Sequence, residues 1–325
     1  MFGSRKPKPL TQRGDSMTSG RISPQFSRQR EKADDEETSL FAPAIAPRFT
    51  LESDVALAAE VIEQLDEAKA KIEHYQQIYL DWGFSAVDPQ GKGIVLNFYG
   101  PPGTGKTLTA EALAGSLARN IMLVSITDLE SKFMGETAKN IAALFRQAER
   151  ENAVLFFDEA DTLLGKRLSS VTQGIDNEVN AMRSTLLIEL EKHAGIVIFA
   201  TNFVKNYDSA FLSRITHHIG FTLPGEPERQ RIWDKLLVAA IPLADDRETL
   251  IAQAVTLSDG LSGRDMRNAM RLALPKAVRS PQQQLALAHI ESALTQIREA
   301  YRAIASSASH IPPHIDTARK MLGVS

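Results

Sequence analysis

The sequence of 325 residues contains no cysteine. This absence excludes disulfide bonds, a thiolate nucleophile, iron–sulfur clusters and any zinc site with cysteine ligands. Long apolar runs are missing too, because the longest uncharged apolar stretch, residues 194–204, is much shorter than the roughly 18 residues that a membrane-spanning helix needs. No apolar stretch follows the basic N-terminus, so we expect no secretory signal and, by default, a cytoplasmic location.

A large excess of one charge is also missing, since 37 Lys and Arg residues oppose 40 Asp and Glu residues and give a formal net charge of −3. The chain as a whole is therefore not expected to be a polybasic nucleic-acid binder. The first 32 residues nevertheless hold eight basic and two acidic side chains, a net charge of +6. We predict a disordered tail over residues 1–48, because it has too little apolar surface to offset the entropy of ordering it. The alternative is a docking arm for a partner or a nucleic acid.

Short apolar runs alternate with helical patterns in the middle of the chain. The runs that predict strands lie at residues 94–99, 121–126, 153–157, 196–200 and, less clearly, 215–221. Helical patterns at residues 106–118, 137–150 and 175–192 separate the first four runs. This alternation predicts an α/β fold with a parallel sheet that is covered by helices on both faces.

Beyond residue 224 the pattern changes from mixed to purely helical. Helices are expected at residues 226–239, 248–256, 264–279 and 283–305, and another helical pattern, residues 53–82, precedes the first strand. We therefore expect an α/β domain over residues 49–224, followed by a smaller all-helical domain over residues 225–325.

The strongest motif is Gly-Pro-Pro-Gly-Thr-Gly-Lys-Thr at residues 100–107, which fits the phosphate-binding P-loop pattern. The glycines allow backbone N–H groups to approach phosphate oxygens, and the helix that starts at Lys106 directs its positive end toward the same phosphates. Lys106 would place a positive charge at the β- and γ-phosphates, and the Thr107 hydroxyl would ligate Mg²⁺. The candidate nucleotide-binding residues of this segment are Gly100, Pro101, Pro102, Gly103, Thr104, Gly105, Lys106, Thr107 and Leu108.

Polar side chains also follow two of the predicted strands. The strand at residues 153–157 is followed by Asp158 and Glu159, and the strand at residues 196–200 is followed by Thr201 and Asn202. We expect Asp158 to hold Mg²⁺ through water, Glu159 to deprotonate the attacking water, and Asn202 to bind the γ-phosphate or that water. With the P-loop, these residues predict hydrolysis of ATP with Mg²⁺ as cofactor.

These motifs resemble those of the AAA+ ATPases over roughly residues 49–280: residues 100–107 look like the Walker A motif, residues 156–159 like Walker B, and Asn202 like sensor 1. The resemblance implies a sheet of order 5-1-4-3-2, a helical lid, and a homo-hexameric ring with ATP between subunits. It also implies that Arg214, in a segment similar to the arginine-finger segment, reaches the neighbouring subunit's ATP. Arg264 would be a sensor 2 that contacts ATP from its own subunit.

The segment Lys132-Phe133-Met134 follows the second strand and looks like the aromatic pore loop of protein-threading AAA+ rings. Phe133 and Met134 would grip a polypeptide without sequence preference, because both offer adaptable apolar contacts. A second pore-facing loop is expected at residues 165–174.

The subtype that the sequence resembles most closely is the pachytene-checkpoint/thyroid-receptor-interactor type, which remodels HORMA-domain proteins. Residues 176–181, 211–214 and 260–264 carry this resemblance. Bacterial members occur in antiphage operons, so the resemblance implies a ring that partly unfolds a HORMA-like partner in such a system.

The alternatives are a general unfoldase or assembly factor, a clamp-loader-like nucleic-acid motor, and a nucleotide-gated scaffold without turnover. Glu159 and Arg214 argue against the scaffold, and the pore-loop segment argues against the nucleic-acid motor.

Overall fold

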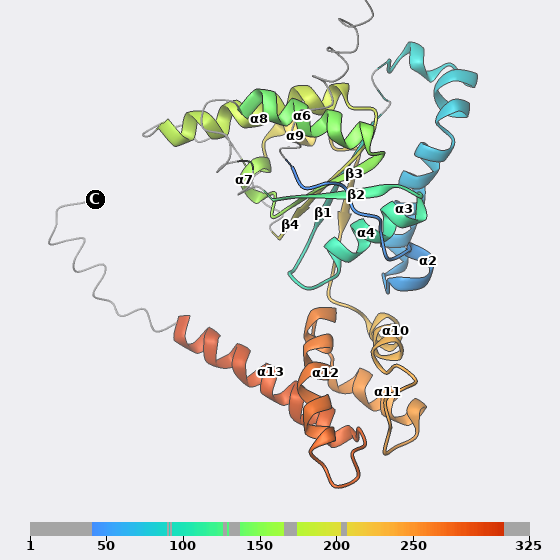
Figure 1. The fold of residues 1–325 in the computed structure, drawn as a ribbon, viewed down its shortest axis with the longest axis vertical. Helices are drawn as coiled ribbons and strands as arrows, with labels where there is room; N and C mark the ends of the chain where they lie inside the picture. Colours follow the sequence, from blue (N-terminus) through green and yellow to red (C-terminus); the bar gives the residue numbers. More distant parts are fainter. Residues whose placement is uncertain are drawn as a thin grey trace, which may run out of the picture. The chain divides into compact units, whose positions relative to one another are not determined.

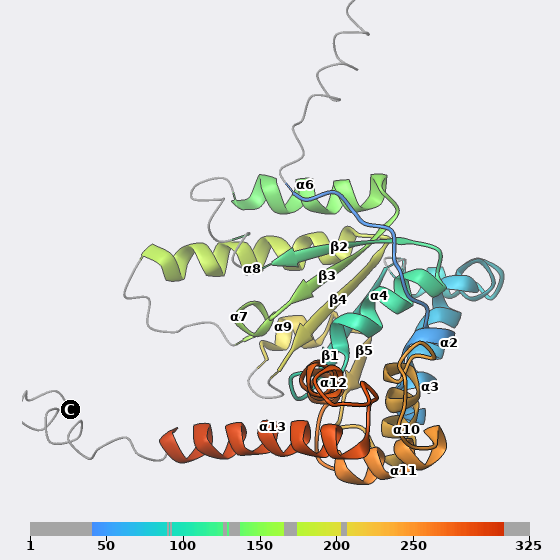
Figure 2. The ribbon, with the colours of Figure 1, turned by 60° about the horizontal axis from the view of Figure 1, so that its bottom comes forward.

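The computed structural model describes residues 41–89, 91, 93–125, 129, 137–165, 174–202 and 207–308. Among these residues, five strands form one sheet: β1 (Ile94–Tyr99), β2 (Asn120–Ser125), β3 (Ala153–Asp158), β4 (Ile196–Thr201) and β5 (His217–Gly220). The strands lie in the order β2-β3-β4-β1-β5, and every neighbouring pair is parallel. This is the order 5-1-4-3-2 counted from the other edge, so the predicted α/β fold is confirmed (Figures 1 and 2).

Helices cover both faces of the sheet (Figures 1 and 2). α6 (Thr137–Arg150) and α8 (Gly174–Lys192) lie on one face, whereas α3 (Ala59–Glu73) and α4 (Lys106–Ser116) lie on the other. Successive residues of β3 enter opposite cores: Phe157 packs with α6 and α8, and Phe156 packs with α3 and α4. Both strand faces are buried because side chains alternate across a strand, which explains why the strands read as continuous apolar runs.

The helical pattern at residues 53–82 forms several elements rather than one helix. They are α2 (Leu51–Asp54), α3 and a π-helix (Gln76–Asp81), after which a 3₁₀-helix (Phe84–Ala86) follows. Two further short helices, α7 (Asp161–Leu164) and α9 (Ser209–Leu212), follow β3 and β4. No helix among the described residues is long and apolar enough to cross a membrane.

After β5 the described chain is helical. It forms α10 (Glu226–Leu236), α11 (Arg247–Leu257), α12 (Gly263–Val278) and α13 (Leu287–Ala308). These helices enclose a core of their own around Trp233, whose indole N–H donates to the Ser258 hydroxyl at 2.9 Å. We refer to these four helices as the lid helices.

The predicted tail reaches residue 48, whereas residues 41–48 lie against the sheet; we call them the edge segment. Phe41 is buried in the core beside α6, and Ile45 forms an antiparallel bridge with Ile121, the second residue of the edge strand β2. The Arg48 guanidinium donates to both carboxylate oxygens of Glu111 in α4, at 2.9 and 3.1 Å. Three anchors spaced along eight residues thus order a stretch whose average composition is that of a tail.

Candidate active site

The P-loop begins where β1 ends, at the carboxyl edge of the sheet. Gly100, Gly103 and Gly105 have φ angles of 142°, 80° and 104°. A Cβ atom at Gly100 would lie 2.0 Å from the carbonyl oxygen of Phe221, and one at Gly103 would lie 2.6 Å from the Ser262 hydroxyl. Both positions therefore exclude any side chain, which leaves the loop backbone accessible to a ligand.

Lys106 begins α4 and is buried beneath this loop, with 8% of its surface exposed. Its ammonium group donates to the carbonyl oxygens of Gly100 and Pro101 at 2.7 and 3.0 Å, and to Oδ1 of Asn202 at 2.9 Å. Burial lowers the pKa of Lys106, and the negative charge of Asp158 opposes that shift. The predicted P-loop lysine and the predicted sensor asparagine therefore meet in the fold.

Two side chains that could ligate a metal ion through oxygen lie close together beside the start of α4. The Thr107 hydroxyl donates to Oδ2 of Asp158 at 3.3 Å, and both residues are exposed. A hydroxyl and a carboxylate are ligands that suit Mg²⁺, which prefers oxygen. The glycine cradle, the buried lysine and this oxygen pair together fit a magnesium–nucleotide complex. Of the remaining loop residues, Pro101, Pro102 and Leu108 are exposed. The Thr104 hydroxyl donates to the carbonyl oxygen of Pro101 at 2.8 Å.

Glu159 follows Asp158 with a φ angle of 52°, in the left-handed region that residues other than glycine seldom adopt. Its backbone N–H donates to Oδ1 of Asp158 at 2.9 Å, and the residue is exposed. Backbone strain of this kind concentrates at functional sites, where it fixes the direction of a side chain. Here the strained residue is the one that the sequence predicts to be the general base.

Arg214 makes its polar contacts away from its own P-loop. Its guanidinium forms an ion pair with Glu191 near the end of α8 and donates to the Ala210 carbonyl oxygen at 2.7 Å. Its side chain is 28% exposed, so part of it stays accessible to another molecule.

Arg264 lies in the first turn of α12, where the lid helices meet the P-loop. Its backbone N–H donates to the carbonyl oxygen of Gly103 at 3.2 Å, and its side chain is exposed. A reciprocal cap holds the start of the helix. The Ser262 hydroxyl accepts from the Asp265 backbone N–H, and the Asp265 carboxylate accepts from the Ser262 backbone N–H. Ser262 lies in the predicted sensor segment 260–264, but its cap with Asp265 is not among the predictions, although Ser-x-x-Asp before a helix is a capping signature.

The predicted substrate-gripping residues Lys132, Phe133 and Met134 lie outside the described residues, as does most of the second expected pore loop. Within the described ranges, no group of His, Asp and Glu side chains forms a metal site made of protein ligands alone.

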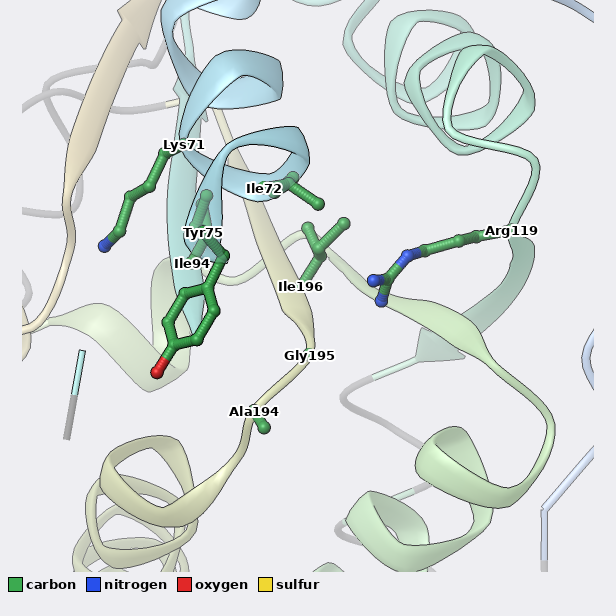
Figure 3. A pocket seen from close by; sticks show the side chains of 8 residues that line it. All are labelled: Lys71, Ile72, Tyr75, Ile94, Arg119, Ala194, Gly195 and Ile196. Atoms are coloured by element: carbon green, nitrogen blue, oxygen red, sulfur yellow. The ribbon is translucent and has the colours of Figure 1, made fainter. Parts of the chain in front are cut away.

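A separate cavity of about 290 Å³ lies at the amino edge of the sheet, where β1 and β4 begin. In Figure 3, Lys71 and Tyr75 extend from the α3 side, and Arg119 points toward Ile196 from the opposite side. Burial lowers the pKa of both Lys71 and Arg119. None of the residues that line the cavity is a predicted site residue. They are Lys71, Ile72, Tyr75, Ile94, Arg119, Ala194, Gly195 and Ile196.

Known proteins include relatives of this chain in sequence and in fold. Residues 96–223 match the model of the ATPase family associated with various cellular activities (AAA). The ATPase family AAA domain-containing protein FIGL1 of Arabidopsis thaliana is 35% identical over 196 residues, which are 58% of this chain and 28% of that protein. The 26S proteasome subunit RPT4 of Saccharomyces cerevisiae is 34% identical over 184 residues, 54% of this chain and 41% of that protein.

A solved structure of the FIGL-1 AAA domain in complex with ADP matches with a TM-score of 0.61 at 23% identity, and the match covers 87% of this chain and 97% of that one. It shares the fold described above. The curated relatives are longer proteins, of which this chain spans between about a quarter and about half.

Proposed function

Because residues 96–223 match the model of the AAA ATPase family, we propose that the chain hydrolyses ATP with Mg²⁺ and uses the reaction to remodel a protein partner. The observation that carries the first half of this proposal is the meeting of Lys106, Asn202, Thr107 and Asp158 at one edge of the sheet. The match to a protein named as a 26S proteasome subunit supports the second half.

Each residue then has a chemical task. The glycine loop presents backbone N–H groups to the phosphates, and Lys106 exchanges its present oxygen partners for phosphate oxygens. Thr107 and Asp158 would hold Mg²⁺, which would neutralise charge on the phosphates. Glu159 takes a proton from the attacking water, and Asn202 orients that water. Arg264 contacts the terminal phosphate from the lid helices of the same chain.

We also propose a homo-hexameric ring in which Arg214 serves the neighbouring subunit. The contacts of Arg214 with Glu191 and Ala210, away from its own P-loop, agree with a role in trans. An arginine finger contributes about 10³–10⁵ in rate. Mixed rings of Arg214→Ala and Glu159→Gln subunits should therefore recover some ATPase activity, because one interface in the mixture pairs an intact finger with an intact base. Mixed rings of verified composition that stay inactive would contradict the trans role.

For the substrate we propose a HORMA-like protein in a bacterial antiphage system, threaded past Phe133 and Met134. The support is the sequence resemblance at residues 176–181, 211–214 and 260–264. A general AAA+ unfoldase or assembly factor is the second candidate, and the match to a proteasome subunit favours it. A clamp-loader-like motor has only the segment around Arg214 in its favour.

Two variants of the full chain test the proposal together. Glu159→Gln should keep ATP binding and lose hydrolysis by at least about 100-fold, since the base is gone while the cradle remains. Phe133→Ala should keep hydrolysis within about twofold of the parent but stop disassembly of a purified HORMA complex.

The outcomes separate the two halves of the proposal. Normal turnover by Glu159→Gln would refute the assigned base. Normal disassembly by Phe133→Ala would refute threading, and a parent chain that unfolds a tagged model substrate but leaves HORMA complexes intact would favour the general unfoldase.

A further inference from the structure

The last turns of α13 touch the first turn of α12. The Tyr301 hydroxyl of α13 donates to Oδ1 of Asp265 at 2.5 Å. Asp265 belongs to the cap at the start of α12, and the next residue toward the P-loop, Arg264, donates its N–H to Gly103. A residue close to the end of the described chain is thus linked to the P-loop through only two intermediate residues.

The carboxylate of Asp265 is buried, and both of its oxygens are occupied. Oδ2 accepts from the Ser262 N–H at 2.9 Å and from the Ser262 hydroxyl at 2.7 Å. Oδ1 accepts from Tyr301. A buried carboxylate requires such donors, because an unsatisfied oxygen in this environment is costly. If the Tyr301 hydroxyl were absent, Oδ1 would need another donor.

The positive charge of Arg264 also acts on this arrangement. The hydrogen bond to Asp265 raises the pKa of Tyr301, and the positive charge of Arg264 opposes that shift, so the guanidinium lies within electrostatic range of the hydroxyl. Among the described residues, the Arg264 side chain has no hydrogen bond or ion pair. The same charge also acts on Lys106 beneath the P-loop. The charge of Arg264 therefore acts both on Tyr301, which fills an acceptor of Asp265, and on Lys106 beneath the loop that would hold phosphate.

We propose that Tyr301 is a positioning residue, which fills Oδ1 of Asp265 and so keeps the Arg264 guanidinium available for the terminal phosphate of a bound nucleotide. This inference rests on the proposed role of Arg264. Loss of the hydroxyl leaves Oδ1 without its donor, and Arg264 turns from the phosphate to the carboxylate. The effect is specific for nucleotides that carry a γ-phosphate, because ADP lacks the γ-phosphate that Arg264 would contact.

The test measures equilibrium binding of ATPγS and ADP to the full chain by calorimetry. Tyr301→Phe removes one hydroxyl from a half-exposed ring and should weaken ATPγS about five- to tenfold, with ADP changed by less than twofold. Tyr79→Phe is the matched control, because Tyr79 also donates to a carboxylate, that of Asp88 at 3.1 Å, in a part of the chain that does not line the P-loop. That control should leave both affinities within twofold.

Two further variants show whether Arg264 transmits the effect. In an Arg264→Ala background, Tyr301→Phe should change neither affinity further, whereas an additional loss there would mean that the lid helices themselves are damaged and would overturn the inference. Asp265→Asn combined with Tyr301→Phe should restore ATPγS binding, because the charge that attracts Arg264 is gone; this pair keeps the inference testable if Tyr301→Phe melts at a lower temperature.

The results separate this inference from the proposed function. Arg264→Ala with an unchanged ratio of ATPγS to ADP affinity would refute the role of Arg264 and the inference with it. A changed ratio for Arg264→Ala together with an unchanged ratio for Tyr301→Phe would refute the inference alone.

Discussion

Lys106 at the carboxyl edge of the sheet and Lys71 at its amino edge are both withdrawn from water, and burial lowers the pKa of each ammonium group. Their surroundings differ in kind. Lys106 has three oxygen partners between 2.7 and 3.0 Å, whereas Lys71 has one carbonyl oxygen, that of Gly93, at 3.4 Å and the face of the Tyr79 ring. A pKa lowered by burial is common to both lysines, so it does not by itself identify a phosphate-binding site. Lys106 differs from Lys71 because three oxygen atoms converge on its ammonium group, and phosphate oxygens of a ligand can replace them.

The largest difference between the two edges should appear when each lysine is removed. We expect Lys106→Ala to lower ATP hydrolysis by more than about 100-fold, because a charge at the transferring phosphoryl group contributes several kcal/mol. Lys71→Ala should change hydrolysis by less than about twofold. Steady-state ATPase assays at saturating ATP measure both, and a large loss in Lys71→Ala would end the distinction between the edges.

A smaller effect should follow when the side-chain partner of Lys106, the amide of Asn202, is removed. Asn202→Ala should lower kcat about 10- to 100-fold with little change in ATP affinity, since one positioned polar group near the reacting water is lost. The counterpart at the amino edge is Arg119→Ala, which should leave kcat and KM unchanged within about twofold. Equal losses in kcat would show that the amino edge also contributes to the reaction.

The smallest effect concerns pH and should belong to the amino edge. His193 is buried just before β4, and burial lowers its pKa from the ordinary 6.5, although Glu149 opposes the shift. As the pH falls through 6.5, the unfolded chain takes up a proton that the folded chain does not. The free energy of unfolding should therefore fall below pH 6.5, by at most about 1.4 kcal/mol per pH unit for one such group. Urea unfolding at pH 7.5 and 5.5 checks this.

His193→Gln supplies the control, because it should flatten that dependence. An unchanged slope in this variant would mean that other groups carry the pH dependence, such as His217 and His218, whose pKa values are also lowered by burial.

Local patterns in the sequence predicted the fold well wherever a local cause decides the structure. β1 and α6 begin and end at the predicted residues, because the apolar run of β1 stops at the P-loop glycine and the apolar face of α6 stops at Arg150. The P-loop was equally readable, since its glycines, lysine and threonine are consecutive. The sequence also pointed to Asp158 and Asn202 from their places after strands, and the parallel sheet brings those strand ends together.

Contacts between residues that are far apart in the sequence could not be predicted from local patterns. The helical pattern at residues 53–82 is interrupted between α2 and α3, where no proline or glycine signals a break. There Arg231 of α10 donates to the Leu57 carbonyl oxygen at 2.6 Å, and Lys235 donates to that of Ser53. Side chains of the lid helices thus donate hydrogen bonds to carbonyl oxygens near the interruption. The pair Arg48–Glu111 and the bond between Tyr301 and Asp265 were missed for the same reason, since neither belongs to a local motif.

The edge segment has a consequence for how the molecule behaves at high concentration. β2 is an outer strand, and Ile45 occupies part of its open side with two backbone hydrogen bonds of 2.9 Å to Ile121. An uncovered outer strand offers unpaired N–H and C=O groups to any extended chain and promotes aggregation. A protein shortened to start at residue 41 should therefore stay dispersed in light scattering, whereas one shortened to start at residue 49 should aggregate. We therefore expect these eight residues to limit self-association through the outer strand of the sheet.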